Sequence, residues 1–401
     1  MTGRRRRGTH SRSAPLGQRL AGPLVALLAL VMVPMLGASS SPAGPDPLSA
    51  RAIPDAPPPP LAPPSAPSGE PAPNAAPEPI PAGPAGTMAD PVKAGCTSTS
   101  AAAFTSGAAP GGFGSEPVAV APAAGRRVPV SSSAALSSAL RGARPGDTIE
   151  LAPGHYSGKF VASGPAGAAA PITVVGSCAS VLDGGPPASG YALHLVGADH
   201  WRLAGFTVTG AQKGIMVERS GHTVLSHLTV GNVGQEAVHL YNFSSDNVVQ
   251  RSLVHDTGTV EPRFGEGLYL GSAESNWATR SGGKPDESNR NRALGNTFRH
   301  TAAENIDVKE ATSGGLIAGN AFDGSAVSGQ NSADSVLDVK GVRYRVVDNR
   351  TTGTSPALKN GFQTHVITDP ATSGCNNIFS GNTFAAQFVR GQAITLDKKC
   401  S

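Results

Sequence analysis

Short strands recur along the second half of this sequence at a spacing that few folds accommodate. Each is three residues long, with two apolar side chains around one residue that faces the other way, and successive strands start about 22 to 38 residues apart. They are Leu193–Leu195, Ile215–Val217, Val238–Leu240, Leu268–Leu270, Ile306–Val308, Leu337–Val339 and Ile394–Leu396, with Thr364–Val366 as a weaker member. A repeat of this length is typical of a solenoid of stacked strands, and the larger spacings indicate loops inserted into particular coils.

A second series of strands follows the first in each coil, beginning with Trp201–Val208 and Thr223–Val230. Several later members end in Gly-Asn-x-Phe, at Gly295–Phe298, Gly319–Phe322 and Gly381–Phe384. An Asn repeated at one place in each coil can stack on itself at strand spacing and hydrogen-bond the neighbouring backbone. Two-residue hairpin turns are scarce, which argues against an antiparallel sandwich. The sequence therefore predicts an all-β fold, a single-stranded parallel β-helix.

One helix is expected just before the first coil, at residues 132–141. Serines can cap its first turn, and Leu136 and Leu140 are spaced to form one apolar face. A solenoid needs its open end covered, so we interpret this segment as an N-terminal capping helix.

The N-terminal region has the composition of targeting and linker segments. Arginines at positions 4–7 precede an apolar run at 20–36, the order found in a signal peptide, and prolines interrupt the run. We expect residues 1–41 to be a cleaved signal of a secreted or cell-surface protein without stable membrane insertion, with an uncleaved anchor as the alternative. Residues 42–92 are mostly Pro, Ala, Gly and Ser, which predicts an extended tether.

Residues 93–401 are long enough for one domain, which we expect to be monomeric. The net charge of +4 is too small to favour a nucleic-acid partner. The four cysteines of an exported chain favour disulfides. Pairing Cys96 with Cys178 and Cys375 with Cys400 would fix both ends of the domain, although two other pairings remain open.

The segment ARPGDTIELAPGHYSG at residues 143–158 resembles the opening of the pectate lyase-like superfamily. Chondroitinase B and alginate lyases share this start, a capping helix followed by a PGDTI-x-L-x-PG-x-Y motif. The resemblance extends from about residue 128 to the end of the chain. It implies a right-handed parallel β-helix, a fold that serves many activities.

Strand alternation identifies the side chains that point away from the core. Ile306 and Val308 point inward, so Asp307 and Lys309 point outward, and Asp338 and Lys340 repeat the pattern one coil later. These two acids and two lysines are expected to form a block about one strand spacing apart. The outward position in other coils is held by His194, His239, Tyr269 and His365. We predict that this column is a substrate groove, with an ordinary mixed-charge face as the alternative.

A column of glutamates stands two residues before three of these strands, at Glu236, Glu266 and Glu304. Like charges stacked on adjacent coils repel one another unless something neutralises them. Carboxylate oxygens that converge from neighbouring strands suit Ca²⁺, so we predict that these glutamates and Asp307 bind calcium. Screening by solvent and pairing with nearby Lys or Arg is the alternative.

Acids beside lysines are what β-elimination on an acidic polysaccharide requires. Cleavage of a uronic-acid polymer removes the C5 proton and expels the C4 oxygen, and it needs the neighbouring carboxylate neutralised, which a metal can do. A Lys near other cations can have a pKa low enough to take the proton. We therefore predict a calcium-assisted polysaccharide lyase, with Lys309 or Lys340 as the base.

Two lyase patterns resemble this block. In chondroitinase B-like and alginate lyases, metal-binding glutamates precede the catalytic Lys by a few residues, as Glu304 precedes Lys309. In some calcium-dependent pectate lyases, two acids three residues apart bind calcium and the Lys comes from a following coil, as with Glu304, Asp307 and Lys340. The first pattern implies a catalytic Arg on the next coil, for which Arg343 is a nearby candidate.

The long insertion at residues 271–291 carries Trp277, Arg280, Lys284 and Arg290. It could stack on a sugar and hold its carboxylates, with a mobile surface loop as the alternative. Two other functions remain open. One is a glycoside hydrolase that uses two of the outward carboxylates, and the other is a non-catalytic glycan-binding surface protein.

Overall fold

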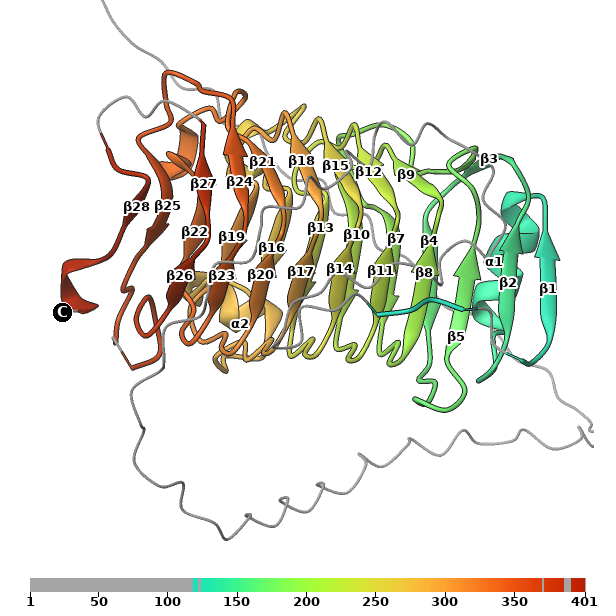
Figure 1. Cartoon of the computed structure of the whole chain (residues 1–401). Helices are drawn as coiled ribbons and strands as arrows, with labels where there is room; N and C mark the ends of the chain where they lie inside the picture. The colour runs from blue at the N-terminus through green and yellow to red at the C-terminus, as the bar shows by residue number, and fades with distance from the viewer. Residues whose placement is uncertain (1–117, 122–123, 370, 386–390, 401) are drawn as a thin grey trace, which may run out of the picture. The chain divides into compact units, whose positions relative to one another are not determined.

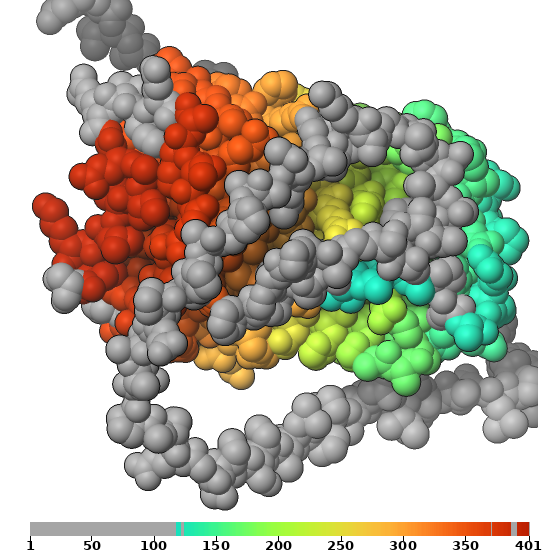
Figure 2. Space-filling model, viewed as in Figure 1, coloured from blue at the N-terminus to red at the C-terminus, as the bar shows by residue number. Residues whose placement is uncertain are grey.

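The computed structural model describes residues 118–121, 124–369, 371–385 and 391–400. Over this range the chain winds into stacked coils, and most coils contribute one strand to each of three parallel sheets (Figure 1). Figure 2 shows the same succession on the molecular surface, with the coils following one another in chain order. The expected signal peptide, the expected tether and Cys96 lie outside the described residues.

We name the sheets A, B and C. Sheet A contains β1 Arg127–Val130, β2 Thr148–Leu151, β5 Ile172–Val175, β8 Trp201–Ala204, β11 Val224–Ser226, β14 Val248–Gln250, β17 Arg292–Leu294, β20 Leu316–Ala318, β23 Arg345–Val347 and β26 Ile378–Ser380. Sheet B contains β3 Gly154–Ser157, β6 Ser180–Asp183, β9 Thr207–Thr209, β12 Thr229–Gly231, β15 Leu253–His255, β18 Thr297–Arg299, β21 Ala321–Asp323, β24 Arg350–Thr352 and β27 Thr383–Phe384. Sheet C contains β4 Phe160–Ser163, β7 Tyr191–Val196, β10 Lys213–Glu218, β13 Val238–Tyr241, β16 Leu268–Leu270, β19 Ile306–Val308, β22 Ser335–Val339, β25 Asn360–Thr364 and β28 Ile394–Thr395.

This arrangement confirms the predicted right-handed parallel β-helix. The first strand series of the sequence forms sheet C, whereas the second series divides between sheets A and B. The segment predicted at Trp201–Val208, for example, bends after β8 and continues into β9. Every strand pair is parallel, so each residue lies beside its counterpart one coil away.

Apolar side chains from all three sheets fill the inside of the coil. Ile306 and Val308 are completely buried, as their alternation with Asp307 predicts. Aromatic rings continue from coil to coil, with centroids 5.5 Å apart for Phe298 and Phe322 and 5.8 Å apart for Phe322 and Phe362. The hydrophobic effect on this continuous core is the main force that holds the coils together.

The predicted Asn ladder runs along the bend between sheets A and B. The backbone N–H of Asn296 donates to Oδ1 of Asn320 at 2.8 Å, and that of Asn320 donates to Oδ1 of Asn349 at 2.9 Å. Asn349 bonds to Asn382 in the same way at 3.0 Å. Each buried side chain thereby satisfies backbone groups that the bend leaves without strand partners.

The capping helix is also confirmed, as α1 Ser133–Arg141. The Ser132 hydroxyl accepts a hydrogen bond from the N–H of Ala135, which caps the first turn. Leu136 and Leu140 are buried and cover the core at the N-terminal end of the stack.

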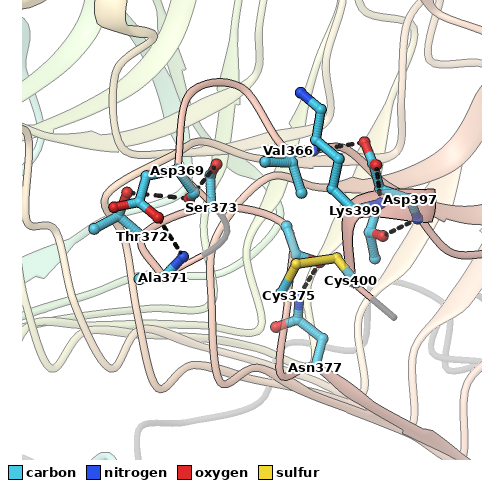
Figure 3. The surroundings of a disulfide bond; sticks show 12 residues. Val366, Asp369, Ala371, Thr372, Ser373, Cys375, Asn377, Asp397, Lys399 and Cys400 are labelled. Atoms are coloured by element: carbon cyan, nitrogen blue, oxygen red, sulfur yellow. Dashed lines mark hydrogen bonds between the residues drawn. A yellow bond between two sulfur atoms is a disulfide. The ribbon is translucent and has the colours of Figure 1, made fainter.

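The C-terminal coil is tied down by the predicted disulfide between Cys375 and Cys400, and Asp397 accepts a hydrogen bond from the N–H of Val366 nearby (Figure 3). Cys178 is also disulfide-bonded. Its expected partner, Cys96, lies outside the described residues, so that pairing stays a prediction.

The insertion at residues 271–291 is an ordered loop that contains η3 Glu274–Asn276 and α2 Trp277–Arg280. The Asp286 carboxylate anchors it by accepting hydrogen bonds from the N–H groups of Asn242 and Phe243 at 2.8 and 2.9 Å. The remaining short helical turns are η2 Pro262–Phe264, η4 Gln330–Ser332 and η5 Lys398–Cys400. In the described part of the chain, no helix is long and apolar enough to cross a membrane.

Candidate functional site

Parallel register arranges outward side chains of sheet C in three columns along the stack. The first column holds Tyr191, Lys213, Glu236, Glu266, Glu304 and Ser335. The middle column holds His194, Met216, His239, Tyr269, Asp307, Asp338 and Gln363. The third column, at the end of each strand, holds Glu218, Tyr241, Gly271, Lys309, Lys340 and His365.

The predicted block of two acids and two lysines forms on β19 and β22. Asp307 lies between both lysines, with Lys309 Nζ 2.7 Å from its Oδ2 and Lys340 Nζ 2.8 Å from its Oδ1. Lys340 Nζ is also 2.6 Å from Oδ2 of Asp338. Burial opposes the charge on both lysines, but the attraction of Asp307 outweighs it and raises their pKa values. Both lysines are therefore cations in this arrangement.

Three carboxylates converge beside this block. One oxygen each of Glu266, Glu304 and Asp307 lies within 4.8 Å of the others, and all three residues are buried. Burial, together with repulsion from Glu236 and Asp307, raises the pKa of Glu266 to about 8. Burial and the charge of Asp307 likewise raise the pKa of Glu304. Such carboxylates either keep a proton or take up a cation.

The donor set fits a calcium ion. Among the described residues, neither Glu266 nor Glu304 has an ion-pair partner, whereas Asp307 has two lysines. Carboxylate oxygens are the hard ligands that Ca²⁺ prefers, and the shared space between these three residues is where their charges would be offset.

Glu236, the fourth predicted ligand, is not part of this group. It pairs with Lys213, which precedes it by one coil in the first column, and with Nδ1 of His239 at 3.2 Å. Burial opposes its charge, but the His239 hydrogen bond and the Lys213 charge hold the pKa of Glu236 at about 2. The protein therefore neutralises this carboxylate with Lys213, and the carboxylates that converge on one space are Glu266, Glu304 and Asp307.

Aromatic side chains pack next to the lysines on sheet C. The rings of His239 and Tyr269 are 4.5 Å apart between centroids, and Lys309 Nζ lies 4.8 Å from the Tyr269 ring. Burial and the charge of Asp307 raise the pKa of Tyr269, which keeps its hydroxyl protonated.

Gly271 has φ +81°, and a Cβ there would lie 2.5 Å from Cγ2 of Thr312. Only glycine fits this turn, so the third column has no side chain between Tyr241 and Lys309.

His365 joins the site in a different register from the one predicted. The strand of its coil is β25, which ends at Thr364, so Gln363 lies beside Asp338 and His365 follows Lys340 in the third column. The strand prediction at Thr364–Val366 was wrong by two residues. The His365 side chain still points outward, and its Nδ1 lies 2.9 Å from Oδ1 of Asp338.

Arg343, proposed as a catalytic residue, is not brought to the lysines. It has φ +57° on the turn that leads from sheet C to β23, and it lines an open hollow with Arg345, Arg292 and Leu316 of sheet A. The turn carries the chain to the sheet A side within three residues of Lys340, so Arg343 does not belong to the lysine block, and its catalytic role stays a prediction. Trp277 lies half-buried on α2, where its Nε1 donates to the carbonyl of Ser272 at 2.9 Å.

A second polar cluster, missed in the sequence, lies on sheet C toward the N-terminal coils. Tyr241 Oη donates to Oε2 of Glu218 at 2.9 Å, and His194 Nε2 lies 3.0 Å from the same oxygen. Asn242 also donates to Glu218 at 3.1 Å. Aligning the residue after each strand, and not only the strand itself, would have placed Glu218 and Tyr241 in the column of Lys309.

No family model matches this chain, and no curated protein sequence does. Solved structures do match. An alginate lyase from a Paenibacillus species is 32% identical over 68% of this chain and 98% of that one, with a TM-score of 0.62. The pectate lyase Pel9A is 15% identical over 64% of this chain and 72% of that one, with a TM-score of 0.46. The Paenibacillus enzyme, a polysaccharide lyase, is the relative that shows the family. The chain therefore belongs to the pectate lyase-like superfamily of right-handed parallel β-helix proteins, in the same family as the Paenibacillus alginate lyase.

Proposed function

We propose that this protein is a secreted polysaccharide lyase that cleaves a uronic-acid polymer by β-elimination on sheet C. The observation that carries the proposal is the block of Asp307, Asp338, Lys309 and Lys340 beside Tyr269. The 32% identical relative is an alginate lyase, so alginate is the first substrate to test.

The two lysines differ in how firmly the protein holds their charge. Among the described residues, Lys340 bridges two carboxylates, Asp307 and Asp338, whereas Lys309 forms an ion pair with Asp307 alone and lies on the Tyr269 ring. A lysine with one counter-ion loses its proton more readily than a lysine with two. We therefore assign Lys309 as the base and Lys340 as the fixed cation that faces the substrate carboxylate. His239, His365 and Trp277 would contact neighbouring sugars.

In the proposed reaction, neutral Lys309 accepts the C5 proton of the uronate. The electron pair of the C5–H bond forms the C4–C5 double bond, and the C4–O bond breaks toward the oxygen. The Tyr269 hydroxyl gives its proton to that oxygen. A proton then passes from the Lys309 ammonium to the Tyr269 phenolate, which restores both groups. Since Asp307 raises the pKa of Lys309, the rate should increase with pH.

Glu266, Glu304 and Asp307 would hold the calcium ion in this proposal. When bound, the ion would neutralise the uronate carboxylate and lower the pKa of the adjacent lysine. Without it, the raised pKa values of Glu266 and Glu304 favour the protonated forms of these side chains.

The activity test uses polymannuronate, polyguluronate, pectate and a glycosaminoglycan, each with and without a chelator. A lyase releases a product whose new double bond absorbs near-ultraviolet light. A hydrolase on the same scaffold releases reducing ends without that absorbance, and a binding protein releases neither. Reducing ends without absorbance on every polymer would reject the lyase proposal.

Matched variants test Lys309 as the base and Tyr269 as the acid. Lys309→Met and Tyr269→Phe should each lower kcat by about 100-fold or more, which is the usual contribution of a general base or acid. Lys359→Met is the control, because Lys359 is an exposed lysine paired with Asp334. Full activity in Lys309→Met, with its fold intact, would contradict the assignment of the base.

A further inference from the structure

Arg280 lies beside the N-terminal strands of sheet C that carry Tyr191 and Tyr241. It is the last residue of α2 and is half-buried. Its guanidinium carbon lies 5.5 Å from the centre of the Tyr241 ring, and it also interacts with the Tyr191 hydroxyl. Tyr191 and Tyr241 belong to β7 and β13, so the loop reaches back across coils that precede it in the chain.

The nearby carboxylates are already engaged by other groups. Glu236 is paired with Lys213 and His239, and Glu218 bonds to His194, Tyr241 and Asn242. Among the described residues, no carboxylate lies within ion-pair distance of Arg280. Burial opposes the charge of this half-buried guanidinium, but Tyr191, Tyr241 and the more distant charge of Glu236 raise its pKa, so Arg280 stays a cation without a paired carboxylate.

The loop holds this guanidinium in place. Asp286 fixes the end of the loop to the backbone that follows β13, and Trp277 fixes its beginning through the Ser272 carbonyl. Contact with the Tyr241 ring further limits the side chain. An arginine held in this way loses little entropy when it binds an anion, and its planar donors match a carboxylate.

The position of Arg280 relative to the lysines indicates which anion it would bind. Tyr241 and Lys309 share the third column two coils apart, a separation of roughly 10 Å at ordinary strand spacing. Gly271 stands between them and presents no side chain. A chain of sugars laid along the stack would cross Lys340, Lys309 and then Arg280.

We propose that Arg280, with Tyr191 and Tyr241, binds the carboxylate of a second uronate in the same polymer, away from the bond that is cleaved. This inference rests on the proposed function. A glycan with a carboxylate only at the cleaved sugar would leave Arg280 without its ligand.

The test compares uronate oligomers of increasing length. Arg280→Met should raise KM about 10- to 100-fold for oligomers long enough to span both positions, the effect of losing a hydrogen-bonded charge pair. It should leave kcat, and the KM of the shortest cleavable oligomer, within about twofold, and Arg280→Lys should recover part of the loss. Arg141→Met, on the exposed face of α1, is the matched control. An unchanged KM on the longest oligomer would overturn the inference.

Direct binding separates this inference from the proposed function. If the wild-type protein cuts no uronate polymer, calorimetric titration with polymannuronate still reports the Arg280 site. A Kd at least 10-fold weaker in Arg280→Met would support the site and reject only the lyase. An equal Kd for both proteins would reject the site, whether or not the polymer is cut.

Discussion

Replacing Glu266 by Gln tests the electrostatics on which the calcium site depends. Glu266 has a pKa of about 8 in the folded protein, against an ordinary value of 4.5, because it is buried and lies near Glu236 and Asp307. Between these two pH values the unfolded chain releases the proton while the folded protein keeps it. Rising pH therefore favours unfolding over this window. The resulting decrease in the free energy of unfolding is complete above about pH 8.

The size of this effect on the free energy of unfolding follows from the pKa shift of Glu266. At about 1.4 kcal/mol for each pKa unit, the difference between 4.5 and about 8 corresponds to on the order of 5 kcal/mol. Gln has nearly the same shape and no charge. In the presence of a chelator, Glu266→Gln should match the wild type at pH 4.5 and be more stable at pH 9.

The assay is unfolding by urea at pH 4.5, 7 and 9, with and without calcium. Calcium should stabilise the wild type at pH 9, because it binds the ionised carboxylates of the folded state, and it should stabilise the variant much less. Exposed Glu287→Gln is the control. If Glu266→Gln and the wild type lose stability in parallel as pH rises, the reasoning about Glu266 is refuted.

Other parts of the molecule give sharper stability tests. Lys340→Met should cost about 3 to 5 kcal/mol of unfolding free energy, because two buried carboxylates lose a shared cation, and a change below about 1 kcal/mol in urea unfolding would contradict the ion pairs. Asn320→Ala should cost about 1 to 3 kcal/mol by interrupting the Asn ladder, whereas Asn276→Ala, at an exposed position without a side-chain cap hydrogen bond, should be neutral in the same melts. Reduction of Cys375–Cys400, which closes 25 residues, should cost about 3 kcal/mol and appear as faster hydrogen exchange confined to the last coil; loss spread over all coils would count against local pinning.

The outward face of sheet C could be predicted because one strand shows which residues point out and the repeat shows which strands are neighbours. Ile306 and Val308 mark Asp307 as outward, and the next coil repeats the pattern with Asp338. In a parallel sheet without hairpins, matching positions become spatial neighbours at one strand spacing. The block with Lys309 and Lys340 therefore followed from local sequence alone.

Contacts that depend on turns and inserted loops could not be obtained in this way. Arg343 is three residues from Lys340 yet faces sheet A, because the turn between them changes the direction of the chain. The register of His365 depends on where β25 ends, which no apolar pattern marks.

The sequence by itself determined the stack of coils, its Asn ladder, its cap and the outward acids and lysines, because all of these depend on short-range alternation repeated at coil length. Only the tertiary structure decided that Lys213 neutralises Glu236 and that Arg280 reaches Tyr191 and Tyr241. The Arg280 contacts join residues whose separation is set by the path of a loop, and the stability of that path depends on the whole surface on which the loop packs.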